Sequence, residues 1–238
     1  MPRPGGQQKL FDTAVHLPNG LVYRPDFITP DEEAELISYI EMLPLAEAEY
    51  GEEARGASAR PSEVFLERNE QKYPEGVQRR YGEYHSQRRH FNFGWGYDFE
   101  NKKFVPGPPL PPFLRMLQLR IGKWLDIPPR RVAEALINEY TPGAPLGWHR
   151  DNEAFEHIVG ISLAGWARMR FRPLTERNEK KDPKKVISLE LEPRSAYIMQ
   201  KDVRWKWQHS VAATKILRYS ITFRTLPKSI PLPTKRRR

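Results

Sequence analysis

The sequence predicts a mainly β fold with some α-helix, in which two supporting helices precede a jelly-roll core, that is, a double-stranded β-helix. After Val132 the hydrophobic pattern changes to a period of two, and about seven short segments of this kind follow one another with turns between them. Short strands at this spacing indicate an all-β sandwich or barrel. Before Val132, two segments carry hydrophobic residues at helical spacing instead. The helices are therefore expected to pack outside the β core.

The first helix is predicted from its start signal. Thr29 can act as the N-cap residue, with Pro30 in the first turn and Glu32 three residues after the cap, which is the capping-box pattern. Hydrophobic residues then recur at helical spacing through about Met42. The other segments before the core are expected, in chain order, to be a poorly ordered end at 1–20, a short strand at 21–23, loop with some short helix at 44–78, a strand or hairpin at 88–99, and a second helix from about 113 to 125.

The core and the limits of the domain follow from the same patterns. The predicted strands lie near 134–140, 157–164, 167–172, 186–191, 195–200, 203–211 and 217–225. With 238 residues and no internal repeat, the chain suits one large domain. The expected organisation is a single domain at 21–226, with a lid at about 79–105 and the core at about 132–226, and then a basic tail at 227–238.

The composition excludes several classes of protein. The absence of cysteine excludes disulfides and thiolate metal sites, so any metal must be held by histidine and carboxylate. No apolar run approaches the roughly 20 residues of a membrane span, and the N-terminus lacks the apolar core of a signal peptide. We expect a cytoplasmic monomer with no membrane partner.

The net charge of +9 favours a polyanion such as nucleic acid as a partner, although a charge that serves only solubility is the alternative. The basic residues are unevenly distributed. They gather at Arg79 and Arg80, at Arg88 and Arg89, at Arg168, Arg170 and Arg172, at 177–185, and in the tail at 235–238. The three alternating arginines either follow phosphates or form a solvated outer face.

Three residues form a candidate metal site. His149 and Asp151 lie two residues apart, and His209 follows sixty residues after His149. Residues i and i+2 of a strand face the same side, so the first two side chains could converge on one ion while His209 arrives from another strand. Two histidines and one carboxylate can occupy one face of an octahedral metal and leave the other face open, as in non-haem Fe(II) oxygenases. A lone His-x-Asp pair is more often an ordinary surface pair, and a zinc-binding cupin-like protein is a further alternative.

The last predicted strand has two different faces. One face carries Leu217, Tyr219, Ile221 and Phe223, and the other carries Arg218, Ser220, Thr222 and Arg224. Because a planar guanidinium can bind both oxygens of a carboxylate, the two arginines could bracket a small dicarboxylate. The polar face then either lines a pocket or faces solvent. Asn138 and Tyr140 share a face of another strand and are neutral partners for the same ligand, unless Tyr140 is a core aromatic.

With these residues in view, the chain resembles the AlkB family of Fe(II)- and 2-oxoglutarate-dependent dioxygenases over roughly residues 88–226. The resemblance rests on the segments NEYTPGAPLGWHRDNE, PRSAYIM, RWKWQHS and RYSITFR. It implies that His149, Asp151 and His209 bind iron. It also implies that 2-oxoglutarate is bound by Asn138, Tyr140, Arg218, Ser220 and Arg224. Arg218 should hold the distal carboxylate, with Arg224 nearer to Asp151, and Ser220 stands where some members carry Asn.

The same resemblance implies a nucleotide-recognition lid in the segment FGWGYDF. Tyr97 and Phe99 match aromatics that hold a flipped base, and Trp95 could serve the same end unless it is a core residue. Glu153 matches an acidic position that contacts the base, and Trp148 is assigned to the substrate site as well. A modified base cannot reach a buried iron while it is stacked in a duplex, so it must be single-stranded or extruded.

The expected function is oxidative demethylation of N-alkylated bases in nucleic acid, with DNA repair foremost and with release of formaldehyde and succinate. The expected partners are O2 and single-stranded or flipped-base DNA, with RNA as a second polymer. Two alternatives remain at this point. One is a dioxygenase of the same fold that modifies tRNA, another RNA or a protein side chain, and the other is a non-catalytic jelly roll that binds nucleic acid.

Overall fold

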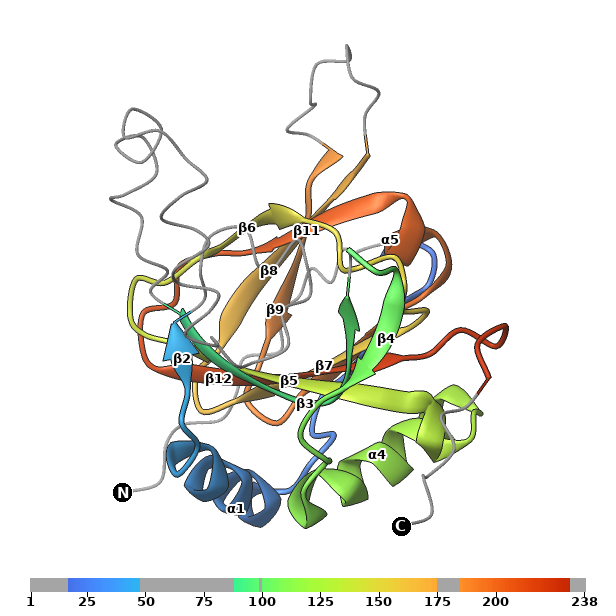
Figure 1. Ribbon diagram of the computed structural model, residues 1–238. Helices are drawn as coiled ribbons and strands as arrows, with labels where there is room; N and C mark the ends of the chain where they lie inside the picture. The colour runs from blue at the N-terminus through green and yellow to red at the C-terminus, as the bar shows by residue number, and fades with distance from the viewer. Residues whose placement is uncertain (1–16, 48–87, 99, 175–184, 232–238) are drawn as a thin grey trace, which may run out of the picture.

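The computed structural model describes residues 17–47, 88–98, 100–174 and 185–231, drawn in colour in Figure 1. Several predictions therefore lie outside the described residues: most of the poorly ordered end at 1–20, most of the loop at 44–78, the part of the lid at 79–87, Phe99, nearly all of the basic loop at 177–185, and the end of the basic tail. No helix in the described part of the chain is long and apolar enough to cross a membrane.

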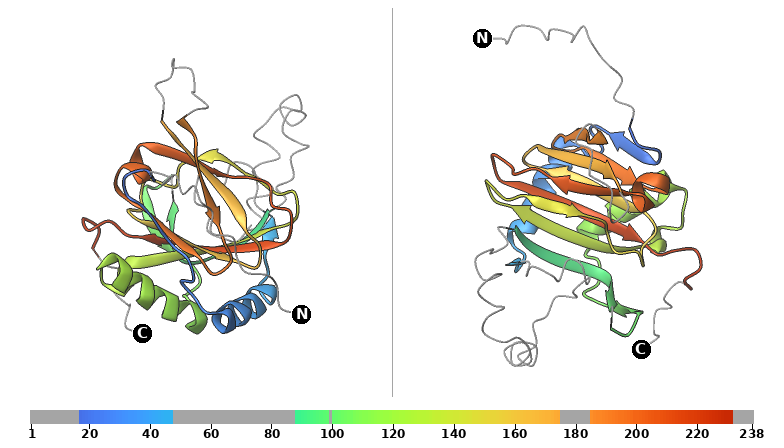
Figure 2. Two further views of the ribbon diagram at one scale, coloured as in Figure 1. Left: turned by 180° about the vertical axis from the view of Figure 1, so that it is seen from behind. Right: turned by 90° about the horizontal axis from the view of Figure 1, so that it is seen from above.

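Two antiparallel sheets face each other and form the jelly-roll core that the sequence predicts (Figures 1 and 2). The larger sheet has the strand order β1-β10-β7-β12-β5-β3-β2, with β4 paired to β3, and the smaller sheet has the order β6-β11-β8-β9. The strands of the larger sheet are β1 (Leu21–Arg24), β2 (Ala46–Glu47), β3 (Arg88–Asp98), β4 (Lys103–Pro106), β5 (Val132–Tyr140), β7 (Ile158–Leu163), β10 (Ala196–Met199) and β12 (Arg218–Thr225). Those of the smaller sheet are β6 (Leu146–His149), β8 (Ala167–Pro173), β9 (Ile187–Leu191) and β11 (Trp207–Val211).

Helices α1 (Pro30–Glu41) and α4 (Pro112–Leu125) cover the outer face of the larger sheet, as Figure 1 shows. One apolar core lies between these helices and the sheet, and a second lies between the two sheets. On β12, Tyr219, Ile221 and Phe223 belong to the first core. The alternate residues of β12 therefore face the space between the sheets, which answers the question left open by the sequence: the polar face lines a pocket.

Helix α1 begins at the capping signal that its sequence predicts, and one of its residues binds α4. Thr29 caps α1, since the backbone N–H of Glu32 donates to the Thr29 hydroxyl at 3.2 Å and the Thr29 N–H donates to the Glu32 carboxylate at 2.8 Å. The same carboxylate also binds the Arg120 guanidinium of α4. Arg120 further donates to the carbonyl of Phe27 at 2.9 Å, so one side chain joins the two helices to the turn that precedes α1.

The prediction of a strand at 203–211 is wrong in its first half. Residues Lys201–Trp205 form a short helix, α5, and the strand β11 begins only at Trp207. The helix is set by a tertiary contact, because the Arg204 guanidinium is buried and donates to the backbone carbonyls of Asn152 and Phe155 at 2.6 and 2.9 Å. The sequence pattern contains no sign of that contact.

A second difference concerns the metal motif. The strand β6 ends at His149, so Asp151 lies beyond the end of the strand and not two positions along it. The side chains of His149 and Asp151 still converge. They are brought together by the loop after β6, and not by the alternation of side chains along a strand.

Strand β3 changes its facing partway along. Arg88, His90 and Asn92 line the pocket between the sheets, and Phe93 packs in the helix-side core. Gly94 has φ +88°, where a residue other than glycine is strained. After Gly94, Trp95 and Tyr97 pack against the core between the sheets. Before Gly94 the even-numbered residues of β3 face the space between the sheets, and after it the odd-numbered residues do.

Gly94→Ala is expected to destabilise the protein by about 2 kcal/mol or more, because of the strained φ and because the added methyl would lie 2.0 Å from the Ala133 carbonyl oxygen. Gly147→Ala is the matched control, since no atom lies within 4 Å of the Cβ it would add. Thermal unfolding followed by circular dichroism should show a clear drop in Tm for Gly94→Ala and little change for Gly147→Ala. Equal melting of both variants would contradict this account of the strand.

Candidate metal centre and co-substrate pocket

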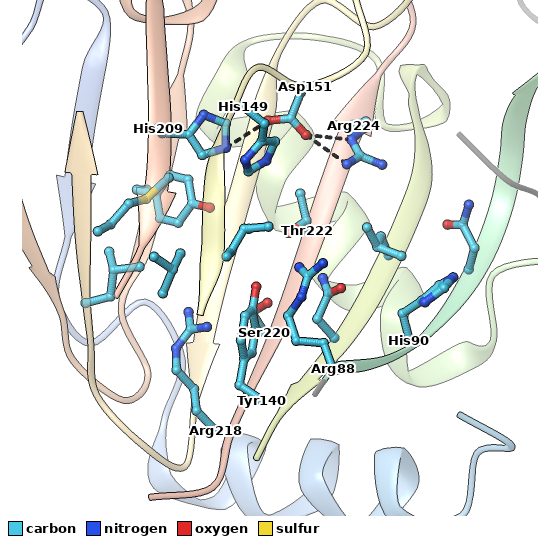
Figure 3. A pocket seen from close by; sticks show the side chains of 18 of the residues that line it. Arg88, His90, Tyr140, His149, Asp151, His209, Arg218, Ser220, Thr222 and Arg224 are labelled. Atoms are coloured by element: carbon cyan, nitrogen blue, oxygen red, sulfur yellow. Dashed lines mark hydrogen bonds and ion pairs between the residues drawn. The ribbon is translucent and has the colours of Figure 1, made fainter. Parts of the chain in front are cut away.

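The pairing of β6 with β11 places His149 directly opposite His209. The two imidazole rings lie 4.2 Å apart between centroids, and the His209 Nε2 atom lies 3.4 Å from the Asp151 Oδ2 atom. One ligand atom from each of His149, Asp151 and His209 falls within 4.8 Å of the other two. In the part of the chain that the structure describes, this is the one group of three or more histidines and carboxylates with that geometry. Figure 3 shows the three side chains converging at one end of the pocket.

The His149 ring is oriented by its own strand. Its Nδ1 atom lies 2.8 Å from the carbonyl oxygen of Gly147, an acceptor, so Nδ1 carries the proton and donates. The Nε2 atom is then deprotonated and free to bind a metal. A backbone carbonyl that fixes the tautomer of a ligating histidine is a common outer contact of metal sites.

Arg224 holds the carboxylate of Asp151. Its Nη2 and Nε atoms donate to the Asp151 Oδ1 atom at 2.8 and 3.1 Å, while its Nη1 atom donates to Glu134 at 2.9 Å. Glu134 is only 1% exposed and also accepts from the Asn92 amide at 2.7 Å. One guanidinium thus links β12, β5, β3 and the loop that carries Asp151, and Asp151 retains its Oδ2 atom for a metal.

The electrostatics of the three residues suit a divalent cation. Burial lowers the pKa of His209 to about 3, and burial also lowers the pKa of His149. Burial alone would raise the pKa of Asp151, but the guanidinium of Arg224 beside it holds that pKa well below its usual range. At neutral pH the site therefore offers two neutral imidazoles and one carboxylate, the protonation state that metal binding requires. These residues fit Fe(II).

The opposite end of the pocket is built around Arg218, which is 2% exposed. Its Nε atom donates to the Ser162 hydroxyl at 3.1 Å, and its guanidinium carbon lies 4.9 Å from the centre of the Tyr140 ring. Its Nη1 atom is buried and has no hydrogen-bond partner among the described residues. A buried cationic donor without a partner fits a carboxylate of 2-oxoglutarate. Asn138 and Ser220 line the wall between Arg218 and the metal ligands, facing each other across β5 and β12.

The structure adds residues to the site that the sequence did not single out. Arg88, Glu134, Tyr197 and Thr222 line the same pocket, and Arg204 supports the backbone of the loop after Asp151. Glu134 and Thr222 could have been predicted from the sequence, because each lies on the same face of its strand as residues already assigned to the site. Tyr197 has room for its ring because residue 160 is glycine, where a Cβ would come within 2.3 Å of that ring.

The predicted substrate residues lie in different places. Tyr97 packs edge-on against Phe104 of β4, whereas Glu153 is 66% exposed in its side chain and pairs with Arg150 at 2.5 Å. Trp148 does not line the pocket. Its ring lies beside two of the alternating arginines of β8. The guanidinium carbons of Arg172 and Arg170 lie 4.2 and 5.3 Å from the centre of the Trp148 ring.

Comparisons with known proteins agree with this geometry. The family model of the 2OG-Fe(II) oxygenase superfamily matches residues 20–224. The chain is 27% identical over 229 residues to the uncharacterized protein L905 of Acanthamoeba polyphaga mimivirus. The alignment covers 88% of this chain and 86% of that protein. The solved structure of OsALKBH1 superposes with a TM-score of 0.56 at 16% identity, covering 88% of this chain and 98% of that one.

The low pKa of His209 predicts an acid-sensitive metal-free protein. Between pH 6.5 and about 3 the unfolded chain binds a proton at this residue and the folded chain does not, so stability falls as the pH falls. Each such histidine contributes a slope of about 1.4 kcal/mol per pH unit in that window. Urea unfolding of metal-free protein between pH 7 and 4 should show a shallower slope for His209→Gln than for the parent, and identical slopes would count against the burial of a neutral imidazole.

Proposed function

The chain belongs to the 2OG-Fe(II) oxygenase superfamily, and from this premise we propose that it removes N-linked alkyl groups from bases of nucleic acid, with single-stranded or base-flipped DNA as its substrate. The chain is a dioxygenase that uses Fe(II) and 2-oxoglutarate. The superfamily model confirms the predicted class of Fe(II)- and 2-oxoglutarate-dependent oxygenase, and the predicted AlkB-like fold is shared with OsALKBH1. The polymer and the alkylated base belong to the proposal.

The division of labour follows from the residues of the pocket. When bound, the iron and 2-oxoglutarate supply the oxidation, in which O2 is consumed, 2-oxoglutarate becomes succinate and CO2, and one oxygen atom goes to the substrate alkyl group. His149, Asp151 and His209 would hold the metal, and Arg218 would fix the far carboxylate of the co-substrate. Apolar side chains limit the entry of water around these groups, namely Leu136, Leu146, Met169, Leu191 and Val211.

The observation that carries the choice of substrate is a row of aromatic rings that runs from the β3–β4 hairpin toward the metal motif. Tyr97 packs against Phe104 at 5.1 Å between ring centroids, and Phe104 packs against Phe155 at 5.4 Å. Phe155 lies 5.9 Å from the guanidinium carbon of Arg224, which binds Asp151. Phe155 is 1% exposed, whereas Tyr97 and Phe104 at the outer end of the row are partly exposed. A flat, uncharged base could stack on one of these outer rings, and each stacked base contributes about 1–3 kcal/mol.

The charge of the chain supports the same class of substrate. The net charge of +9 favours a polyanion, and the phosphate backbone would supply most of the affinity. Because the metal ligands His209 and Asp151 are 6% and 7% exposed, only an unpaired or extruded base could bring its alkyl group to them.

The metal-ligand variants test the enzyme assignment. His149→Ala and Asp151→Ala should each abolish release of formaldehyde and succinate from methylated oligonucleotides, because each removes one of the three candidate ligands. His157→Gln is the matched control, since His157 is half-buried, bonds to Thr225 at 3.0 Å and lies outside the pocket, so this variant should keep its turnover. Full turnover in either ligand variant would show that the metal lies elsewhere.

The substrate class is tested with the same protein on a panel of methylated single-stranded DNA, duplex DNA, tRNA and peptide. The proposal expects 2-oxoglutarate-dependent release of formaldehyde to be fastest on single-stranded DNA. A preference for tRNA would show that the substrate is RNA and would leave the proposed demethylation unchanged. Turnover on peptide alone would refute a nucleic-acid substrate.

Tyr97→Ala is expected to raise KM for a methylated oligonucleotide about 5- to 100-fold, since it removes one stacking ring. Tyr39→Ala is the control, because it removes a ring of the same kind from α1, where Tyr39 stacks on Phe113 on the far side of the larger sheet. Steady-state kinetics should show the change in KM only for Tyr97→Ala. An equal change in both variants would point to a general loss of stability.

A further inference from the structure

The closed end of the pocket contains two arginines on either side of one tyrosine. Tyr140 on β5 is paired in register with Arg218 on β12 and with Arg88 on β3. The guanidinium carbons of these residues lie 4.9 Å and 5.6 Å from the centre of the Tyr140 ring. In Figure 3 the ring lies between the two side chains, at the end of the pocket opposite His149, Asp151 and His209.

Both arginines are buried, Arg88 at 6% and Arg218 at 2% exposure, and both line the pocket. A buried guanidinium is unfavourable unless an anion or hydrogen-bond acceptors compensate it. The buried carboxylates of the pocket, Asp151 and Glu134, are bound to Arg224 near the metal ligands. Among the described residues no carboxylate lies within ion-pair distance of Arg218, so an anionic ligand at this end of the pocket could compensate the charge of that guanidinium.

The pKa of the Tyr140 phenol is affected by both arginines. Burial alone would raise its pKa, but Arg88 and Arg218 together bring the pKa below its ordinary value. A group that loses its proton more easily despite complete burial lies in a strongly positive environment. The same environment favours the charged form of a carboxylate placed beside it.

We propose that Arg88 is a second anchor for the distal carboxylate of 2-oxoglutarate, which is held between Arg88 and Arg218 beside Tyr140. The proposal rests on the assignment of Arg218 to that carboxylate and goes beyond it in two respects. It makes a residue of the lid strand β3 part of the co-substrate site, and it gives Arg88 a share in the selection of 2-oxo acids that have a second carboxylate.

The test is direct binding of two 2-oxo acids, measured by isothermal titration calorimetry on the full chain loaded with Fe(II) under anaerobic conditions, where no turnover can occur. Arg88→Met should raise Kd for 2-oxoglutarate about 10- to 100-fold, the range expected for one charge-assisted hydrogen bond. It should leave Kd for 2-oxopentanoate unchanged, because that acid has no distal carboxylate. Arg88→Lys keeps the charge and should recover part of the loss.

Arg89→Met is the matched control. Arg89 is the next residue of β3, its side chain is 51% exposed, and it forms an ion pair with Glu139 outside the pocket. This variant should bind both acids as the parent does. Should Arg88→Met prove too unstable to purify, Arg88→Gln gives the same comparison with a polar side chain.

Two outcomes would overturn the proposal. Unchanged Kd for 2-oxoglutarate in Arg88→Met would show that Arg88 does not contact the co-substrate, and an equal rise for both acids would show that Arg88 only supports the packing of Tyr140. Arg218→Met separates this failure from a failure of the underlying assignment, because loss of selectivity in Arg218→Met alone leaves Arg218 as the single anchor. No nucleic acid enters the measurement, so the outcome is independent of the proposed substrate.

Discussion

The buried guanidinium of Arg224 is the interaction on which the polar interior depends. It binds Asp151 from the loop after β6 and Glu134 from β5, and through Glu134 it reaches Asn92 of β3. Burial would lower the pKa of Arg224, but the two carboxylates raise it above its ordinary value, so the charge is retained. Removing any one partner would leave a charge uncompensated in a space with little water, which is costly. The metal ligands and the larger sheet are therefore held in one fixed arrangement.

This network explains why the space between the sheets differs from the core between the helices and the larger sheet. The helix-side core is apolar and contains Ile121, Ile137 and Phe223, each of which is 0% exposed. Such a core contributes stability through burial of apolar surface and close packing. The space between the sheets also contains charged residues, which must each find a partner or a ligand. The chain thus uses one face of the larger sheet for stability and the other for chemistry.

Strand β3 joins the parts of the proposed function. Its first residues face the pocket, Gly94 redirects the chain, and Tyr97 then contributes a ring to the row that leads toward the metal motif. Under the two proposals, one strand would contact the co-substrate through Arg88 and the substrate base through Tyr97. A single element in contact with both ligands offers a physical route by which the binding of one could affect the other.

The sequence by itself determined the class of fold, both helices, most strands and the identity of the candidate metal ligands. It could do so because periodicity and the capping pattern at Thr29 are local, and because the order of the motifs is specific. Only the tertiary structure decided that His149 pairs opposite His209, that residues 201–205 form a helix, and that Arg88 joins Arg218 beside Tyr140. Each of these depends on which strands become neighbours and on buried contacts between residues far apart in the chain. Periodicity along a single segment carries no information about either.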